Sequence, residues 1–193
     1  MCCLSTFELD FVDFRIKIME GSTIKKKVKG RNKMKSSMAS FDIEYAHRFY
    51  DFDGEAQYLH GHSGTLTVEI GGEIDSETGF VHPCAGIKRS VWDYLKCFDH
   101  ALILQHEDPL LSGVLAVYEH QKIRYGSPHN RNLGRPFDND LATAYPECRL
   151  VVTSKAATCE NLIEIFYSLL KDSFNITKMT FSSGSNCASR TFF

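Results

Sequence analysis

The stretch YLHGHSGTLTVEI, residues 58–70, alternates between two kinds of side chain and therefore predicts a β-strand. Polar residues occupy one face of this strand. The other face carries His60, His62, Leu66, Val68 and Ile70. His60 and His62 thus lie at the start of the strand, on the same face as the apolar residues. They are either metal ligands or polar residues at the point where the strand follows a loop.

The preceding stretch SFDIEYAHRF, residues 40–49, has the same alternation. Its apolar face carries Phe41, Ile43, Tyr45 and His47. We expect the two strands to pair antiparallel through a connection over residues 49–58. Gly71 and Gly72 interrupt the second strand and predict a bulge or bend there.

The remaining regular segments predict two helices and two further strands. Apolar residues recur at helical spacing in residues 84–98 and 157–174, and Thr158 is a candidate N-cap. Residues 148–154 and 176–183 are typical of buried strands. The order predicts an α+β fold with helices on one face of an antiparallel sheet.

We divide the chain into an N-terminal extension, residues 1–38, and a domain over residues 39–193 with an insertion at about 111–147. The extension holds a basic run at 25–35, which is typical of a solvated linker and less often of an anion-binding arm or a targeting signal. The insertion lacks periodicity and is rich in turn-forming residues, which is typical of a lid or a disordered segment.

Bulk composition predicts a soluble, cytoplasmic protein of one domain. The 193 residues carry a net charge of −2, which gives no overall attraction to nucleic acid or membranes. No apolar run approaches the roughly 18 residues that span a bilayer. The first residues include acids where a signal peptide is basic, and the seven cysteines are odd in number and scattered, as reduced thiols are.

The two histidines of the opening stretch can reach one ion because residues two apart in a strand point to the same side. His47 shares the parity of the neighbouring apolar face and could supply a third imidazole, as in catalytic zinc sites. The alternative is that the H-x-H pattern occurs by chance in a chain with eight histidines.

Asp99 and His100 form a second candidate, directly after the first predicted helix. An aspartate beside a histidine can orient the ring for proton transfer. The alternative is a helix end at which both residues simply face water.

An ordered set of motifs resembles the 6-pyruvoyl-tetrahydropterin synthase and 6-carboxytetrahydropterin synthase family. The motifs are AHRF, LHGHS, VEIGGEIDSETGFV, IKRSVWDYL, FDHALIL, DPLL and TCENLIEIFYSLL. They span roughly residues 40–110 and 148–190. The resemblance implies a tunnelling fold, with a four-stranded antiparallel sheet and two helices per subunit. It further implies a homo-oligomeric barrel with active sites at subunit interfaces.

The same resemblance implies a site and a reaction. It makes His47, His60 and His62 ligands of zinc, which would polarise the side-chain oxygens of a dihydroneopterin triphosphate-like substrate. It makes Asp99 and His100 the catalytic pair that assists proton transfer.

The chain departs from the family where relatives carry a catalytic cysteine, a few residues before H-G-H. The stretch DFDGEAQYLHGH contains no cysteine, and Ala56 stands four residues before His60. Glu55 is a candidate substitute base, with Asp53 a weaker one and a solvated loop carboxylate the alternative.

A second departure concerns the ring of the substrate. Relatives have a glutamate in the last strand, whereas Ser182 or Ser183 stands here, and serine cannot make the charge-assisted bidentate contact of a carboxylate. Ser182, Thr158 and Glu160 are the substrate-binding candidates, although Glu160 also suits the start of a helix.

These features favour a zinc-dependent lyase on a pterin-like small molecule, acting by metal-assisted proton abstraction and elimination. The alternative is a catalytically altered or inactive family member that serves as a metal-containing ligand-binding or assembly protein. A third hypothesis, nucleic-acid binding by the basic run, has no other support in the sequence.

Overall fold

The computed structural model describes residues 35–125 and 134–191. The predicted N-terminal extension therefore lies almost entirely outside the described residues. The strands are β1 (Lys35–His47), β2 (His60–Gly72), β3 (Ala101–Gln105), β4 (Ala142–Tyr145), β5 (Leu150–Thr153), β6 (Ile176–Ser183) and β7 (Asn186–Thr191). The helices are α1 (Cys84–Leu95), α2 (Leu110–Tyr125) and α3 (Cys159–Leu170), with short 3₁₀ turns η1 (Glu55–Gln57) and η2 (Pro146–Cys148).

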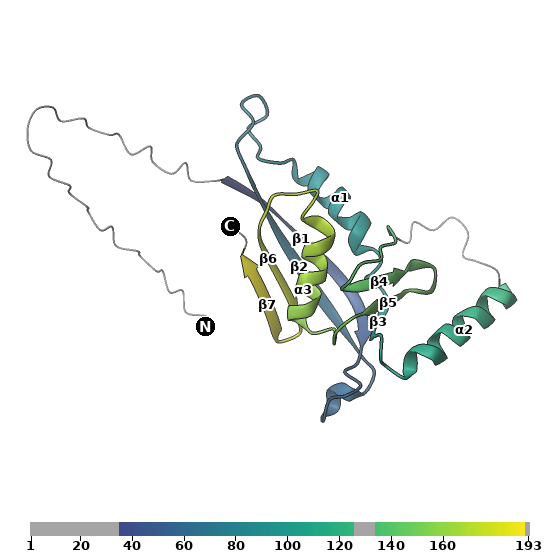
Figure 1. Ribbon diagram of the computed structural model, residues 1–193. Coiled ribbons are helices and arrows are strands. Elements are labelled where there is room, and N and C mark those ends of the chain that lie inside the picture. Colours follow the sequence, from purple (N-terminus) through teal and green to yellow (C-terminus); the bar gives the residue numbers. More distant parts are fainter. Residues whose placement is uncertain (1–34, 126–133, 192–193) are drawn as a thin grey trace, which may run out of the picture. The chain divides into compact units, whose positions relative to one another are not determined.

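All these strands join one mixed sheet in the order β4-β5-β3-β1-β2-β6-β7 (Figure 1). Neighbours pair antiparallel except β1 with β3 and β3 with β5, which are parallel. The α+β class is confirmed, but the prediction of a four-stranded antiparallel sheet was wrong. The sheet has seven strands because short segments at 101–105, 142–145 and 186–191 add to the four predicted ones.

The long strands β1 and β2 pair antiparallel, as predicted. His47 pairs with His60, and Tyr45 pairs with His62. Burial alternates along both strands, so that the face with the histidines is also the face that covers the core. The register between β2 and β6 shifts between Glu69 and Ile70, just before the two glycines that predicted a bulge.

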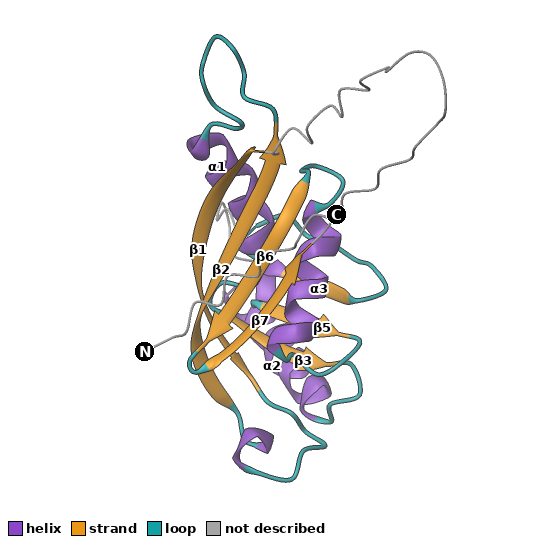
Figure 2. Ribbon diagram, turned by 90° about the vertical axis from the view of Figure 1, so that its left-hand side faces the viewer, coloured by secondary structure: helices purple, strands orange, loops and turns teal. Residues whose placement is uncertain are grey.

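Helices α1 and α3 cover the apolar face of the sheet (Figure 2). Helix α1 buries Ile87, Val91 and Leu95. Helix α3 begins after Thr158, whose hydroxyl accepts a hydrogen bond from the Asn161 backbone amide at 3.3 Å, as predicted for an N-cap. Both helices match the predicted segments because each has an apolar stripe at helical spacing.

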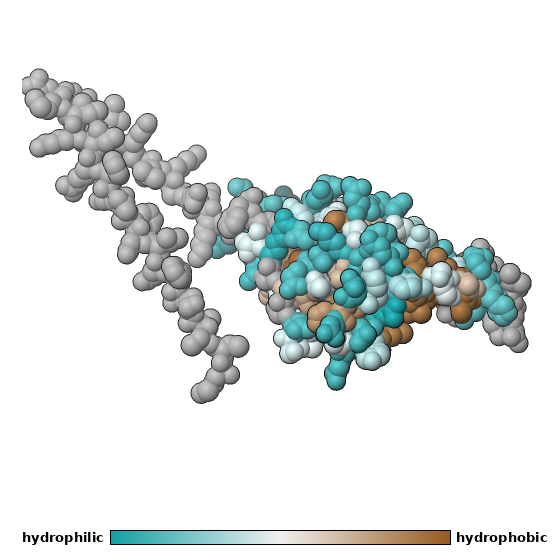
Figure 3. Space-filling model, turned by 60° about the horizontal axis from the view of Figure 1, so that its bottom comes forward, coloured by the Kyte–Doolittle hydropathy of each residue, from teal (hydrophilic) through white to brown (hydrophobic). Residues whose placement is uncertain are grey.

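The segment around 111–147 differs from its prediction, since it contains α2 and β4 within its described residues. Apolar residues occur all around α2, so the sequence shows no stripe of period 3.6. Helix α2 extends away from the sheet (Figure 1), and its side chains Leu115 and Val117 are exposed. Apolar surface gathers at the same end of the molecule (Figure 3). None of the helices in the described residues is long and apolar enough to cross a membrane.

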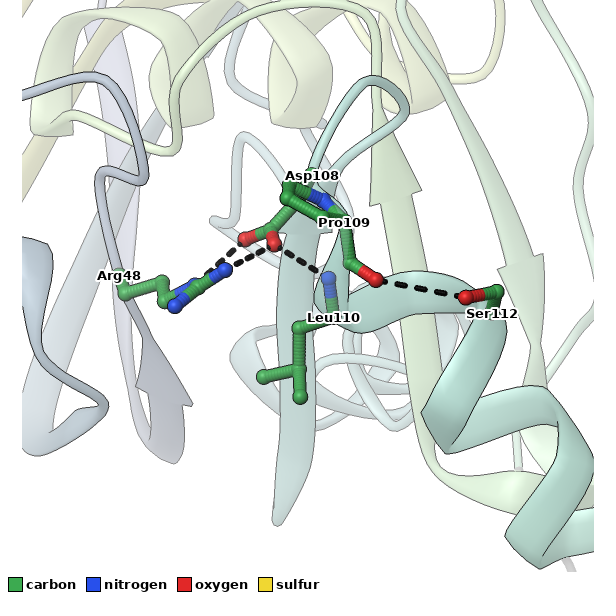
Figure 4. A network of polar contacts seen from close by, with 5 residues as sticks. All are labelled: Arg48, Asp108, Pro109, Leu110 and Ser112. Carbon is green, nitrogen blue, oxygen red and sulfur yellow. Dashed lines mark hydrogen bonds and ion pairs between the residues drawn. The ribbon is translucent and has the colours of Figure 1, made fainter.

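A buried ion pair ties the end of β1 to the start of α2 (Figure 4). The Arg48 guanidinium donates two hydrogen bonds to the Asp108 carboxylate, whose side chain is fully buried. The Leu110 backbone amide donates to the same carboxylate at 2.8 Å. Burial alone would raise the pKa of Asp108, but these hydrogen bonds and the charge of Arg48 hold it below its usual value.

Gly64 is a position in β2 where a side chain cannot be accommodated. A Cβ there would lie 2.6 Å from Phe181 Cζ and 3.1 Å from Tyr45 Cε1. We expect Gly64→Ala to lower the free energy of unfolding by about 1–3 kcal/mol, because it overpacks the core under the hairpin. Urea denaturation measures this.

Gly61→Ala is the matched control in the same strand, since a Cβ there meets only the Tyr45 carbonyl oxygen at an ordinary 3.5 Å. Equal losses of stability in the two variants would contradict the packing argument.

The Arg48–Asp108 pair gives a second prediction. Arg48→Met leaves a buried carboxylate without its cation, so we expect a loss of about 3 kcal/mol in the free energy of unfolding of the metal-free protein. Adding Asp108→Asn removes the buried charge but keeps an oxygen for the start of α2, and should restore part of the loss. If the two substitutions destabilise the protein additively in urea denaturation, the buried charge is not the cause.

Candidate active site

Three histidines converge where the β1–β2 hairpin ends. One ring nitrogen from each of His47, His60 and His62 lies within 4.8 Å of those of the other two. His47 is 4% exposed, and the other two are partly exposed. Antiparallel pairing of His47 with His60, with His62 two residues further on the same face, produces this cluster.

Backbone carbonyls fix which nitrogen of two rings is free. His47 Nδ1 lies 3.0 Å from the Ala157 carbonyl oxygen, and His60 Nδ1 lies 2.8 Å from that of Tyr58. Because a carbonyl only accepts, each Nδ1 carries the hydrogen and each Nε2 keeps its lone pair. This is how ligand histidines are commonly oriented in zinc sites, so the donor set fits a zinc ion.

The surroundings of the cluster lower the pKa of two of its rings, His47 and His62. Burial, followed by the proximity of His60 and His62, lowers the pKa of His47 to about 4. Burial and His60 also lower the pKa of His62. Neutral imidazole is the form that binds a metal.

The cluster lines a pocket of about 380 Å³ on the helix-covered side of the hairpin. The start of α3 forms one wall, with the candidates Thr158 and Glu160. Hydrogen bonds from its own backbone amide and from the Thr158 side chain lower the pKa of Glu160. This carboxylate is therefore ionised at the mouth of the pocket.

Ser183, rather than Ser182, lies in the pocket. Ser182 pairs with Thr65 and points to the opposite face of the sheet, so its prediction as the pocket residue is corrected. Ser183 is 3% exposed, and its Oγ accepts a hydrogen bond from the Tyr45 hydroxyl at 2.8 Å. The pocket thus holds two linked hydroxyl groups at the place where relatives were expected to have a carboxylate.

Ala56, four residues before His60, lies in the wall of the pocket with the histidines. Its carbonyl oxygen accepts a hydrogen bond from the Phe49 amide at 2.9 Å. Glu55, the candidate substitute base, is exposed on η1 and is not among the residues that line the pocket, and Asp53 is also exposed. The methyl group of alanine therefore stands where the resemblance places a cysteine.

Sequence reasoning missed Cys159, which lines the same pocket and is 9% exposed. It is the first residue of α3 and follows the predicted N-cap Thr158 directly. Its place beside that substrate-binding candidate is the signal from which it could have been found. The Ala157 carbonyl oxygen was missed as well, because nothing in a sequence links it to a histidine 110 residues away.

Asp99 and His100 form the predicted pair, with Asp99 Oδ2 2.9 Å from His100 Nδ1. The pair does not lie in the histidine pocket. His100 lines a groove of about 730 Å³ together with Glu44, Ser63 and Arg149. Glu44 and Ser63 alternate with the histidine face, so the groove opens on the other side of the hairpin. Tyr45 and His62 also line this groove, so within one chain the Asp–His pair lies beside the histidine cluster but in a separate cavity.

Comparison with solved structures supports the fold. The chain is similar to a 6-pyruvoyl tetrahydropterin synthase of Caenorhabditis elegans, with a TM-score of 0.52 and 17% identity over 83% of this chain and 96% of the other. It is also similar to an uncharacterized protein of Wolinella succinogenes, with a TM-score of 0.54 and 17% identity over 82% and 98% of the two chains.

Comparison of sequences supports the family. The chain is 28% identical over 103 residues to 6-carboxy-5,6,7,8-tetrahydropterin synthase of Rickettsia typhi, covering 52% of this chain and 75% of the relative. A family model described as 6-pyruvoyl tetrahydropterin synthase matches residues 37–187 and thus includes the histidine cluster, the Asp–His pair and Ser183. The chain belongs to the 6-pyruvoyl tetrahydropterin synthase family.

Proposed function

We propose that the protein is a zinc-dependent lyase of the 6-pyruvoyl/6-carboxy-tetrahydropterin synthase type. Its substrate is dihydroneopterin triphosphate or a related pterin-like molecule. The observation that carries this proposal is the cluster of three histidines in a pocket, in a chain that belongs to this family.

His47, His60 and His62 hold the zinc, and Nε2 is the available lone pair on the first two. Bound zinc supplies Lewis acidity, which makes a carbon acid beside the coordinated oxygens easier to deprotonate. The carbonyl oxygens of Ala157 and Tyr58 keep the rings aligned, and the buried Tyr45–Ser183 pair presents hydroxyl groups to the ring of the substrate.

Asp99 and His100 carry out the proton transfer. Asp99 accepts from His100 Nδ1, which leaves Nε2 of an exposed ring to take or give a proton. Since the pair lines a different cavity from the one that holds His47 and His60 of its own chain, it acts on the pocket of a neighbouring copy. The complete site therefore forms at a subunit interface in a homo-oligomer.

The second candidate is a metal-containing ligand-binding or assembly protein. Ala56 in the pocket wall favours it, because a methyl group cannot act as a base, and so does Ser183, because a hydroxyl group cannot replace a carboxylate.

Restoring the thiol separates the two candidates. We expect the zinc-loaded full chain to convert dihydroneopterin triphosphate slowly, and Ala56→Cys to raise kcat at least about 100-fold, the lower end of what a positioned base contributes. Chromatography of the products measures turnover. Ala56→Ser is the matched control, since it adds a polar atom of similar size without a thiolate.

The lyase proposal fails if neither the wild-type protein nor Ala56→Cys converts this substrate while both hold stoichiometric zinc. Binding of the unchanged substrate under those conditions would support the ligand-binding candidate.

The lowered pKa of His47 predicts how stability depends on pH. His47 has a folded-state pKa of about 4 against 6.5 for the unfolded chain, so the unfolded state binds more protons between these values. The stability of the metal-free protein should therefore fall as pH drops from 6.5 toward 4, by up to about 3 kcal/mol from this residue.

Urea denaturation of the metal-free protein across this range measures the effect, with His47→Gln as the control. The variant should lose less stability than the wild-type protein on acidification. An identical pH dependence in both proteins would show that His47 is not held neutral by burial.

A further inference from the structure

Arg149 contacts the segment that carries the Asp–His pair from a distant part of the chain. Its Nη1 donates to the Asp99 carbonyl oxygen at 2.9 Å and to the Lys96 carbonyl oxygen at 3.1 Å. Lys96 is the C-cap of α1, where backbone carbonyls lack helical partners and attract positive charge. One guanidinium group therefore binds both the end of α1 and the turn that follows it.

The Asp99–His100 peptide bond is held from both sides. Arg149 binds its carbonyl oxygen, and its amide donates to the Glu44 carbonyl oxygen at 2.5 Å. The Glu44 amide in turn donates to Asp99 Oδ1 at 3.2 Å, so the same carboxylate that pairs with His100 is fixed to β1.

This peptide bond needs such support because His100 adopts a left-handed backbone conformation with φ of 58°. That conformation is unfavourable for a residue with a Cβ atom. The His100 side chain is 71% exposed, so the direction of its ring depends on the backbone at this residue and on Asp99.

Arg149 itself is firmly held. Its backbone also has a left-handed conformation, with φ of 51°, immediately before β5. Its amide donates to the Pro146 carbonyl oxygen at 3.2 Å, and its carbonyl oxygen accepts from the Leu102 amide at 2.8 Å. The guanidinium group thus extends from the β3–β5 pair, and not from a free loop.

We propose that Arg149 is a positioning residue for proton transfer. It holds the Asp99–His100 peptide bond so that the exposed imidazole faces the groove, and it acts through His100 without taking part in zinc binding. This inference rests on the proposed proton-transfer role of the Asp–His pair.

Arg149→Met tests the proposal, because methionine keeps an unbranched side chain but donates no hydrogen bond. In the zinc-loaded full chain we expect kcat to fall about 10- to 100-fold, with KM changed less than about threefold and zinc content unchanged. Arg149→Lys should recover most of kcat, since an ammonium group can also donate to carbonyl oxygens.

Arg135→Met is the matched control. This arginine donates to the Tyr94 hydroxyl and stacks on its ring in a different surface pocket, so its loss should leave kcat unchanged. The double variant Arg149→Met/His100→Ala should have nearly the same kcat as His100→Ala alone, because both substitutions remove the proton transfer by His100.

Amide hydrogen exchange of the full chain provides a readout that does not depend on turnover. The His100 amide should exchange at least about tenfold faster in Arg149→Met, and near the wild-type rate in Arg149→Lys and Arg135→Met. Unchanged exchange at this amide in Arg149→Met would overturn the inference.

The two proposals fail in different ways. If His100→Ala leaves turnover intact, the proton-transfer role of the pair is wrong. If His100→Ala abolishes turnover while Arg149→Met does not reduce it, that role stands and the positioning role of Arg149 is wrong.

Discussion

The antiparallel register of β1 and β2 is the constraint on which the rest of the site depends. Pairing of His47 with His60 places three imidazoles on one face, and the same face continues into the core. A slip of one residue in either strand would move its histidines to the opposite face. Phe41, Ile43, Leu66 and Val68 oppose such a slip, because it would expose them as well. Core packing and metal-site geometry are thus fixed by the same hairpin.

The metal-site candidates and the Asp–His pair line two different cavities along this hairpin. The covered face holds the histidine pocket, and the other face holds the groove with His100. In the proposed enzyme the two groups meet across a subunit interface, because within one chain they line different cavities that share only Tyr45 and His62. Ala56 and Ser183 line the pocket where the resemblance implies a thiol and a carboxylate, so the proposed enzyme combines the three histidines with a different base and a different anchor for the ring.

Much of the core of this fold could be predicted from the sequence, because strand and helix periodicities are local. They gave the shared face of the three histidines and the inner stripes of α1 and α3. Helix α2 could not be found this way, since apolar residues occur all around it. The parallel pairing of β3, the place of Ser183 in the pocket and the wall at Cys159 depend on contacts between distant segments, which no local pattern records.

In the proposed enzyme, three histidines and no other side chains of the chain hold one zinc ion. The zinc K-edge X-ray absorption spectrum of the zinc-loaded full chain tests this most directly, because it distinguishes nitrogen from sulfur ligands by bond length. We predict scattering from three imidazole rings at Zn–N distances of about 2.0–2.1 Å, with no sulfur bonded to the metal. Sulfur at about 2.3 Å, which would place a cysteine such as Cys159 on the zinc, or fewer than three imidazoles, would contradict binding by the three histidines.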